Sequence, residues 1–164
     1  MLRLLVTGAL IALSDSGAQP APPEQGTEWL CVTCGTQYPS AVNTPSGCPI
    51  CLDSRQYVGL NGQQWTTLDE LHKTHKNEIT EEEEPGKFSI YTKPSFAIGQ
   101  RAFLVKTAEG NLLWDCVSLL DEKTQAKIRR LGGISAIAIS HPHFYTTMVE
   151  WSRVSTTLLS IFTN

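Results

Sequence analysis

The 164-residue sequence lacks a long apolar run and lacks an excess of basic charge. No segment reaches the roughly 20 apolar residues that a membrane-spanning helix needs, so we expect no membrane span. Lys and Arg number 13 against 16 Asp and Glu, which gives a formal net charge of -3. Without a basic stripe to neutralise phosphates, the sequence predicts no nucleic-acid partner. Its 41% hydrophobic content fits a globular protein of one medium domain or two small ones.

Residues 1–26 are expected to be an apolar leader followed by a proline-rich linker. The apolar stretch Leu4–Leu13 can be a secretory signal, with cleavage near Ala18 or Ala21. The alternative is a plain apolar leader or a misassigned start. Because the cysteine pattern described next fits a reducing compartment, we expect a cytoplasmic protein, with secretion as the alternative.

Four cysteines before the middle of the chain form the most specific motif. Cys31 and Cys34 make one C-x2-C pair, and Cys48 and Cys51 make another. Each spacing lets two thiolates point at one ion from a tight turn, so the two pairs together predict a tetrahedral metal site with four sulfur ligands. The alternative is two disulfides in a secreted protein. A closed four-sulfur site has no open coordination position, so its role is structural or electron-carrying.

The same residues resemble a known metal-binding unit. The pattern C-x2-C-G-x2-Y followed by C-P-x-C, within Trp29–Tyr57, is similar to a rubredoxin-like knuckle, which we assign to residues 27–58. The resemblance implies one zinc or iron ion bound by the four cysteines. Leu52 stands where that family usually has glycine. The fifth cysteine, Cys116, lies in a strand-like run and is expected to be a small buried residue.

Residues 59–86 are predicted to form a helix and an acidic linker. Thr67 is suited to cap the helix, and the acidic run 81–84 before Pro-Gly is typical of a solvated linker. His72 and His75 are three residues apart and can share one face of the helix. No carboxylate is placed to complete a metal shell, so we expect both to be ordinary exposed histidines.

From residue 88 the pattern changes to strands. Residues 88–107 alternate apolar and polar side chains, and a turn leads into a returning strand over 112–120. A helix is predicted over 121–131, with Asp121 as its N-cap. The apolar run 134–140 is typical of a strand buried on both faces.

His141 and His143 directly follow this apolar strand, where α/β proteins often place functional groups. The order of elements over residues 87–153 resembles the N-terminal half of the metallo-β-lactamase fold. The fold class expected is therefore α/β, a partial αββα sandwich of that type preceded by the rubredoxin-like knuckle. The resemblance implies metal-assisted hydrolysis, with His141 and His143 as zinc ligands and zinc-bound water as the nucleophile.

The chain departs from the His-x-His-x-Asp-His pattern of that family. Tyr145 stands at the aspartate position and Thr146 at the next histidine, while Asp115 matches the family's strand-end aspartate only loosely. A catalytic zinc normally has three protein ligands, so the set is incomplete and no catalytic residue is assigned. The alternative is that His141 and His143 only cap the end of a strand.

Residues 154–164 carry no charge and show no strand-turn-helix order. Val154-Ser155 can be encoded by GTAAGT, a common intron start, so we interpret the segment as a candidate read-through tail. The alternative is an apolar helix over Thr146–Phe162 that closes the core. A lone half of the sandwich would leave one sheet face uncovered.

The hypothesis favoured by these motifs is a truncated metallo-β-lactamase-like hydrolase of doubtful activity, acting on a small-molecule substrate that the sequence does not identify. The first alternative is a non-enzymatic metal knuckle for electron transfer or docking. The second is a fragment without a stable function.

Overall fold

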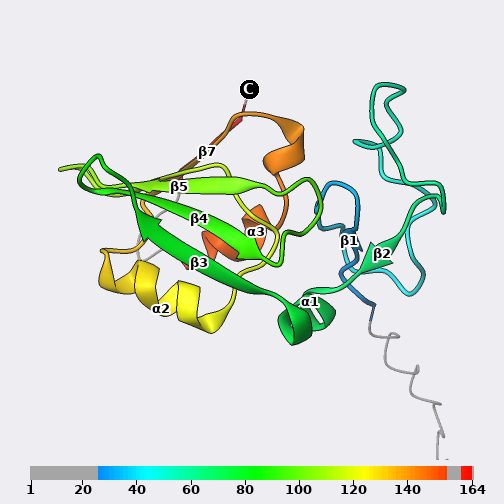
Figure 1. The fold of residues 1–164 in the computed structure, drawn as a ribbon, viewed down its shortest axis with the longest axis horizontal. Coiled ribbons are helices and arrows are strands. Elements are labelled where there is room, and N and C mark those ends of the chain that lie inside the picture. The colour runs from blue at the N-terminus through cyan, green and yellow to red at the C-terminus, as the bar shows by residue number, and fades with distance from the viewer. Residues whose placement is uncertain (1–25, 155–159, 164) are drawn as a thin grey trace, which may run out of the picture.

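Alternating apolar and polar residues build a six-stranded sheet, which is the main body of the protein (Figure 1). A computed structural model describes residues 26–154 and 160–163, the last four as backbone only. The strand order follows the chain. The strands are β3 (Lys76–Glu81), β4 (Lys87–Lys93), β5 (Arg101–Val105), β6 (Leu112–Trp114), β7 (Ala136–Ile139) and β8 (Ser160–Thr163). Pairing is antiparallel from β3 to β6 and parallel from β6 to β8.

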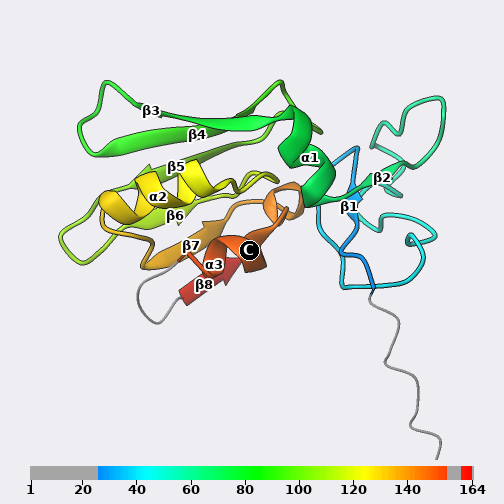
Figure 2. The same ribbon diagram turned by 90° about the horizontal axis from the view of Figure 1, so that it is seen from below.

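A second, two-stranded sheet lies at one end of the main sheet (Figure 2). It pairs β1 (Leu30–Cys31) with β2 (Trp65–Thr66) in antiparallel register. Helix α1 (Leu68–Thr74) lies between the two parts. Leu30, Leu71 and Leu119 are buried together, so the small sheet, α1 and the main body share one apolar contact.

Two further helices pack on one face of the main sheet. Helix α2 (Glu122–Arg130) contributes Ile128, and α3 (Met148–Ser152) contributes Trp151. Both side chains are fully buried in the main core with strand residues such as Leu104. Asp121 caps α2 as predicted, because its carboxylate accepts a hydrogen bond from the Thr124 backbone at 2.7 Å.

The other face of the main sheet is only partly covered by the described residues. Phe103 pairs with Trp114, and Val105 pairs with Leu112. These side chains alternate with the core residues of their strands and lie outside the core cluster. Trp114 is 46% exposed, although an aromatic of this size is usually well buried.

The helix predicted within residues 65–84 is wrong beyond Thr74. The cap is confirmed, since Thr67 accepts a hydrogen bond from the Glu70 backbone at 3.2 Å. The chain then continues as the edge strand β3, in which Asn77 is buried and donates from its side chain to the Leu119 carbonyl at 2.7 Å. Pairing with β4 overrides the local preference for a helix. Strand β7 also differs from expectation, since its residues alternate between buried and half-buried instead of being buried on both faces.

The last segment contains more regular structure than its composition predicts. Val154 is buried in the main core, and β8 extends the sheet beside β7. The alternative of one helix over Thr146–Phe162 is wrong, because α3 is short and β8 follows it. The read-through interpretation itself stays a prediction.

Two sequence predictions concern residues that the structure does not describe or describes only in part. The leader over 1–25 lies outside the described residues, as do residues 155–159 and 164 of the last segment. Within the part of the chain that is described, no helix is both long and apolar enough to cross a membrane.

Candidate metal centre and histidine loop

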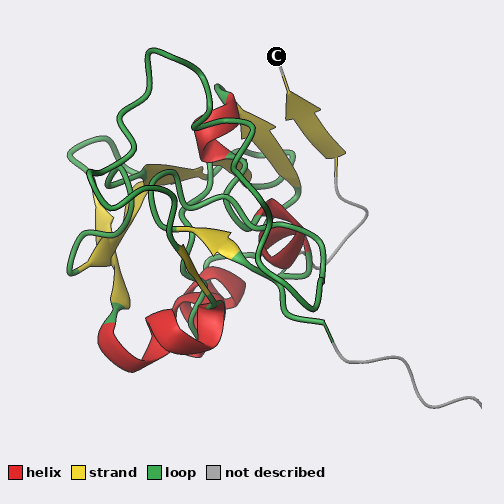
Figure 3. Ribbon diagram, turned by 90° about the vertical axis from the view of Figure 1, so that its right-hand side faces the viewer, coloured by secondary structure: helices red, strands yellow, loops and turns green. Residues whose placement is uncertain are grey.

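The four cysteines predicted to bind a metal lie close together. They belong to the end of the molecule that faces the viewer in Figure 3, where most of the backbone is loop. The first pair closes a turn in which the Gly35 backbone donates to the Cys31 carbonyl at 2.7 Å. Gly35 has φ of 76°, a conformation that favours glycine. The second pair closes a similar turn, because the Cys51 and Leu52 backbones both donate to the Cys48 carbonyl at 2.9 Å.

The sulfur atoms are arranged as a metal-binding tetrad. All four lie within 4.8 Å of one another. Each close contact joins the two turns, with 3.7 Å between the Sγ atoms of Cys31 and Cys51 and 3.5 Å between those of Cys34 and Cys48. A tetrahedral site with metal–sulfur distances of about 2.3 Å places its sulfurs about 3.8 Å apart. None of the four forms a disulfide. The arrangement therefore fits one bound metal ion, and its chemistry does not distinguish zinc from iron.

Burial opposes the ionisation of this cluster in the absence of a cation. Burial is the largest influence on Cys51 and raises the pKa of its thiol to about 12. Hydrogen bonding between Cys31 and Cys34 lowers the pKa of Cys31 and raises that of Cys34. The Cys31 thiolate therefore forms readily, whereas those of Cys34 and Cys51 need a positive charge beside them. A divalent metal ion supplies that charge.

Two side chains outside the cysteine turns donate hydrogen bonds to the sulfurs. The Tyr38 hydroxyl donates to Cys48 Sγ at 3.0 Å, and Gln63 Nε2 donates to Cys31 Sγ at 3.1 Å. Tyr38 is held edge-on against Trp65, with 5.4 Å between the ring centroids. Such donors stabilise negative charge on a ligand sulfur and tune the metal it holds. Cys116 lies apart in the main core, where burial raises the pKa of its thiol.

Asp115 positions the histidine loop at the carboxyl end of β7. Its carboxylate accepts hydrogen bonds from the backbone and the hydroxyl of Ser140, the residue before His141. Asp115 has φ of 63°, a left-handed conformation that Asp tolerates better than most residues. The sequence matches Asp115 only loosely to the strand-end aspartate of the metallo-β-lactamase pattern, and its contact with Ser140 shows a structural role in placing the loop.

The two predicted histidines form a stacked pair. Their rings are 4.7 Å apart with an interplanar angle of 14°, and their Nδ1 atoms are 2.8 Å apart. His141 Nδ1 also accepts from the His143 backbone at 3.3 Å, which favours the tautomer in which His143 Nδ1 carries the proton between the rings. In neutral His143 the Nε2 atom then carries a free lone pair.

That Nε2 atom is buried and has no hydrogen-bond partner among the residues that the structure describes. Burial is the main reason that the pKa of His143 lies below its usual value, with the charge of His141 acting in the same direction. His143 is therefore neutral near pH 7, which is the form that binds metals. An unpartnered buried lone pair is uncommon and is what a metal ligand needs.

Tyr145 and Thr146 stand where the metallo-β-lactamase pattern has an aspartate and a histidine, and they do not complete a ligand set for His141 and His143. Tyr145 packs against the main core, and the Thr146 carbonyl accepts a hydrogen bond from the Gln37 backbone at 2.9 Å. His75, the C-cap of α1, bonds Thr74 and contacts Phe96 edge-to-face, so its ring is already engaged. Among residues 26–154, the four cysteines are the one group of three or more metal-binding side chains.

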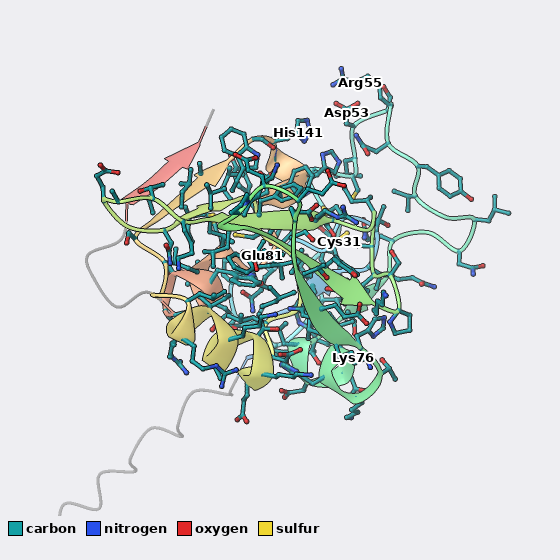
Figure 4. All side chains as sticks on the ribbon, turned by 60° about the vertical axis from the view of Figure 1, so that its left-hand side comes forward. Cys31, Asp53, Arg55, Lys76, Glu81 and His141 are labelled. Carbon is teal, nitrogen blue, oxygen red and sulfur yellow. The ribbon has the colours of Figure 1, made fainter. Side chains whose placement is uncertain are left out.

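The histidine loop and the second cysteine turn line a common hollow of about 360 Å³. His141, His143 and Pro142 form one wall, and Asp53 and Arg55 are among the residues of the other. Figure 4 shows His141 on the same side of the molecule as Asp53 and Arg55. Arg55 donates to Asp53 at 2.6 Å, and this partner holds the pKa of the Asp53 carboxyl below its usual range. Sequence reasoning did not find this pair, because no motif surrounds it.

Fold and site together define a mixed α/β protein with a candidate four-cysteine metal centre beside a pair of histidines. No family model matches the chain. The chain is 49% identical over 126 residues, 76% of its length, to a protein of Bacillus subtilis (strain 168) that carries the name "Uncharacterized protein YmaE". The aligned part covers 46% of that relative, so the chain spans about half of the relative's length.

Proposed function

We propose that this chain is the N-terminal part of a metal-dependent hydrolase of the metallo-β-lactamase type, supported by a rubredoxin-like four-cysteine centre. The observation that carries the proposal is the free, buried Nε2 lone pair of His143 beside His141. The pair follows β7 at the carboxyl end of a parallel strand, which is where open α/β sheets bind ligands.

In this proposal the four-cysteine centre has a structural role. Its four thiols leave no coordination position for water, so a metal held there would not activate a nucleophile. All four cysteines are at most 3% exposed. Since the cluster cross-links residues 31 to 51, its metal would contribute directly to the folding of this end of the chain.

In this proposal the site of His141 and His143 would carry out the hydrolysis. A bound zinc ion would supply a hydroxide nucleophile near neutral pH and polarise the substrate carbonyl. His143 would hold the ion through Nε2, and His141 lies beside it. Asp115 fixes the start of the loop through Ser140, so the two imidazoles are preorganised.

Two imidazoles are fewer than the three protein ligands that a catalytic zinc normally has. The proposal therefore requires further ligands from a second half of the fold. Two observations support such a half. The relative is about twice as long as the aligned part, and the sheet face carrying Phe103 and Trp114 is only partly covered. A second sheet packed on this face would bury it, as in an αββα sandwich.

Zinc titration of the purified chain, with the four-cysteine centre already filled, tests the histidine site. We expect a second zinc ion to bind weakly and to be lost in the His141→Ala/His143→Ala variant. The matched control is His72→Ala/His75→Ala, which should bind the second ion like the unmodified chain. Equal zinc binding by the unmodified chain and the His141→Ala/His143→Ala variant would contradict the proposal.

The hydrogen bonds to the cysteine sulfurs favour a second candidate function, electron transfer. Donors such as Tyr38 and Gln63 stabilise the more negative state of an iron–thiolate centre and so set its reduction potential. Protein purified without oxygen should then contain iron and show a reversible redox couple, and Tyr38→Phe should shift its potential. Zinc as the only metal in such a preparation would exclude this function.

A further inference from the structure

Gln100 joins the four-cysteine centre to the histidine loop. Its side-chain Nε2 donates to the Cys34 carbonyl at 2.5 Å and to the His143 carbonyl at 3.1 Å. Each acceptor is the backbone carbonyl of a candidate metal ligand, Cys34 at the four-cysteine centre and His143 in the histidine loop. These two residues are far apart in the sequence. Gln100 is 7% exposed, so water does not replace either bond readily.

Two neighbouring contacts hold the same pair of segments together. The Gln37 backbone donates to the Thr146 carbonyl at 2.9 Å, and Ser118 Oγ donates to the Gly35 carbonyl at 2.9 Å. Thr147 Oγ1 in turn donates to the Ser118 carbonyl at 2.9 Å. The first cysteine turn is therefore attached to the histidine loop and the residues after it by several hydrogen bonds.

The packing at this contact leaves no room for adjustment. A Cβ atom added at Gly35 would collide with Ser118 Oγ and would lie 3.3 Å from Gln100 Nε2. The two hydrogens of an amide nitrogen lie in one plane in a fixed fork. A displacement of the Cys34 carbonyl therefore cannot be absorbed by Gln100 without weakening its bond to His143.

We propose that Gln100 is a positioning residue through which the filled four-cysteine centre fixes the His141–His143 loop. The contact itself rests on the geometry above, and the role of the metal rests on the proposed function. Metal–thiolate bonds fix the turn that carries the Cys34 carbonyl, and Gln100 passes this constraint to the backbone of His143. The four-cysteine centre thus governs the order of the second site without taking part in its chemistry.

The test is the imidazole nitrogen NMR spectrum of the full 15N-labelled chain, with and without its metal. Removal of the metal by a chelator should shift the resonances of His141 and His143 in the unmodified protein. The backbone amides of α2 are the internal control and should stay unchanged. In Gln100→Ala the histidine resonances should start from displaced positions and should respond much less to metal removal.

Two further variants separate hydrogen bonding from packing. Gln100→Glu keeps the size of the side chain but cannot donate to the two carbonyls, so it should behave like Gln100→Ala. Gln125→Ala, on α2, is the matched control and should match the unmodified protein. Unchanged histidine resonances on metal removal, or in Gln100→Ala, would overturn the proposal, as would unmodified behaviour of Gln100→Glu.

Elemental analysis of the same samples distinguishes a failure of the proposed function from a failure of the positioning role proposed for Gln100. Absence of any metal in the unmodified protein would contradict the function proposed for the four cysteines. The comparison of Gln100→Ala with the unmodified protein needs no metal, so it would still decide whether Gln100 positions His143.

Discussion

Asp115 and Ser140 are joined by two hydrogen bonds, at 2.8 Å from the Ser140 backbone and at 2.9 Å from its hydroxyl. The contact spans β6 and β7 and involves both oxygens of a carboxylate that is 5% exposed. It fixes the backbone immediately before His141. The position of the histidine pair is thus set from two directions, by Asp115, which follows β6, and by Gln100, which precedes β5 and bonds the Cys34 carbonyl.

Replacing Asp115 by alanine should destabilise the protein. The backbone and hydroxyl of Ser140 lose their acceptor, and alanine adopts the positive φ of this position less readily, so we expect a loss of about 1–3 kcal/mol. Urea unfolding measures it. Asp69→Ala, at an exposed position on α1, is the control and should cost less than about 1 kcal/mol. An unchanged midpoint in Asp115→Ala would show that the contact does not hold the loop.

Replacing Cys34 by serine should release the metal and unfold residues 29–57 locally. A serine hydroxyl is a poor ligand for zinc or iron, and the remaining three thiolates leave an open position. Metal content and amide exchange of this segment check the result. Cys116→Ala removes a cysteine from the main core and should keep one metal per chain. Full metal retention in Cys34→Ser would rule out the four-sulfur site.

Replacing Gly35 by alanine should weaken the contact between the cysteine turn and the main body. The new Cβ collides with Ser118, and the left-handed backbone costs a non-glycine residue about 1–2 kcal/mol by itself. Gly59→Ala is the matched control, since no atom lies within 4 Å of its added Cβ. We expect a lower melting temperature only in Gly35→Ala. Equal melting temperatures of the two variants would contradict the packing described here.

We expect Asp121 to make the free energy of unfolding decrease with falling pH in the acid range. Burial opposes its ionisation, but hydrogen bonds from the Asn77 and Thr124 backbones outweigh it, and the pKa of Asp121 lies below its usual value. Its contribution is therefore full above about pH 4, the pKa of an unfolded Asp, and is lost as pH falls further. Asp121→Asn keeps one acceptor of two, so it should cost about 1–2 kcal/mol at pH 7.

Measuring the unfolding free energies of Asp121→Asn and the unmodified protein at lower pH tests the direction of this pH dependence. The difference between Asp121→Asn and the unmodified protein should narrow as pH falls below about 4. Glu122→Gln, at the exposed next position, should show a smaller effect. A difference that stays constant down to about pH 2 would contradict the predicted linkage.

The chain as it stands should hydrolyse esters, lactams and thioesters no faster than its His141→Ala/His143→Ala variant. Two imidazoles under-coordinate a zinc ion, and neither Tyr145 nor Thr146 supplies the missing ligands. Spectrophotometric assays with added zinc measure the rates. A zinc-dependent rate clearly above that of the variant would mean that the described residues suffice for catalysis.

Local patterns predicted the parts of this protein whose causes are local. The C-x2-C spacing places two sulfurs on one turn, and Asp121 before an amphipathic segment marks a helix start. The grouping of the four cysteines followed from their chemistry. The predicted helix failed beyond Thr74, because the strand pairing that replaces it depends on a partner beyond the next turn.

The contacts that organise the site could not be predicted in this way. Gln100 and Cys34 are 66 residues apart, and neither the glutamine nor its neighbours form a motif. A buried amide that satisfies two distant carbonyls leaves no periodic signal in the sequence. Only the fold brings its partners together.

The order of the contacts along the chain has a consequence for biosynthesis. The ribosome synthesises the four cysteines by residue 51, before it makes Gln100, Ser118 or the histidine loop. The four candidate metal ligands are therefore synthesised well before the residues against which this turn packs. If the four cysteines bind a metal ion, as proposed, the nascent chain can bind it before the sheet that packs against this turn has formed.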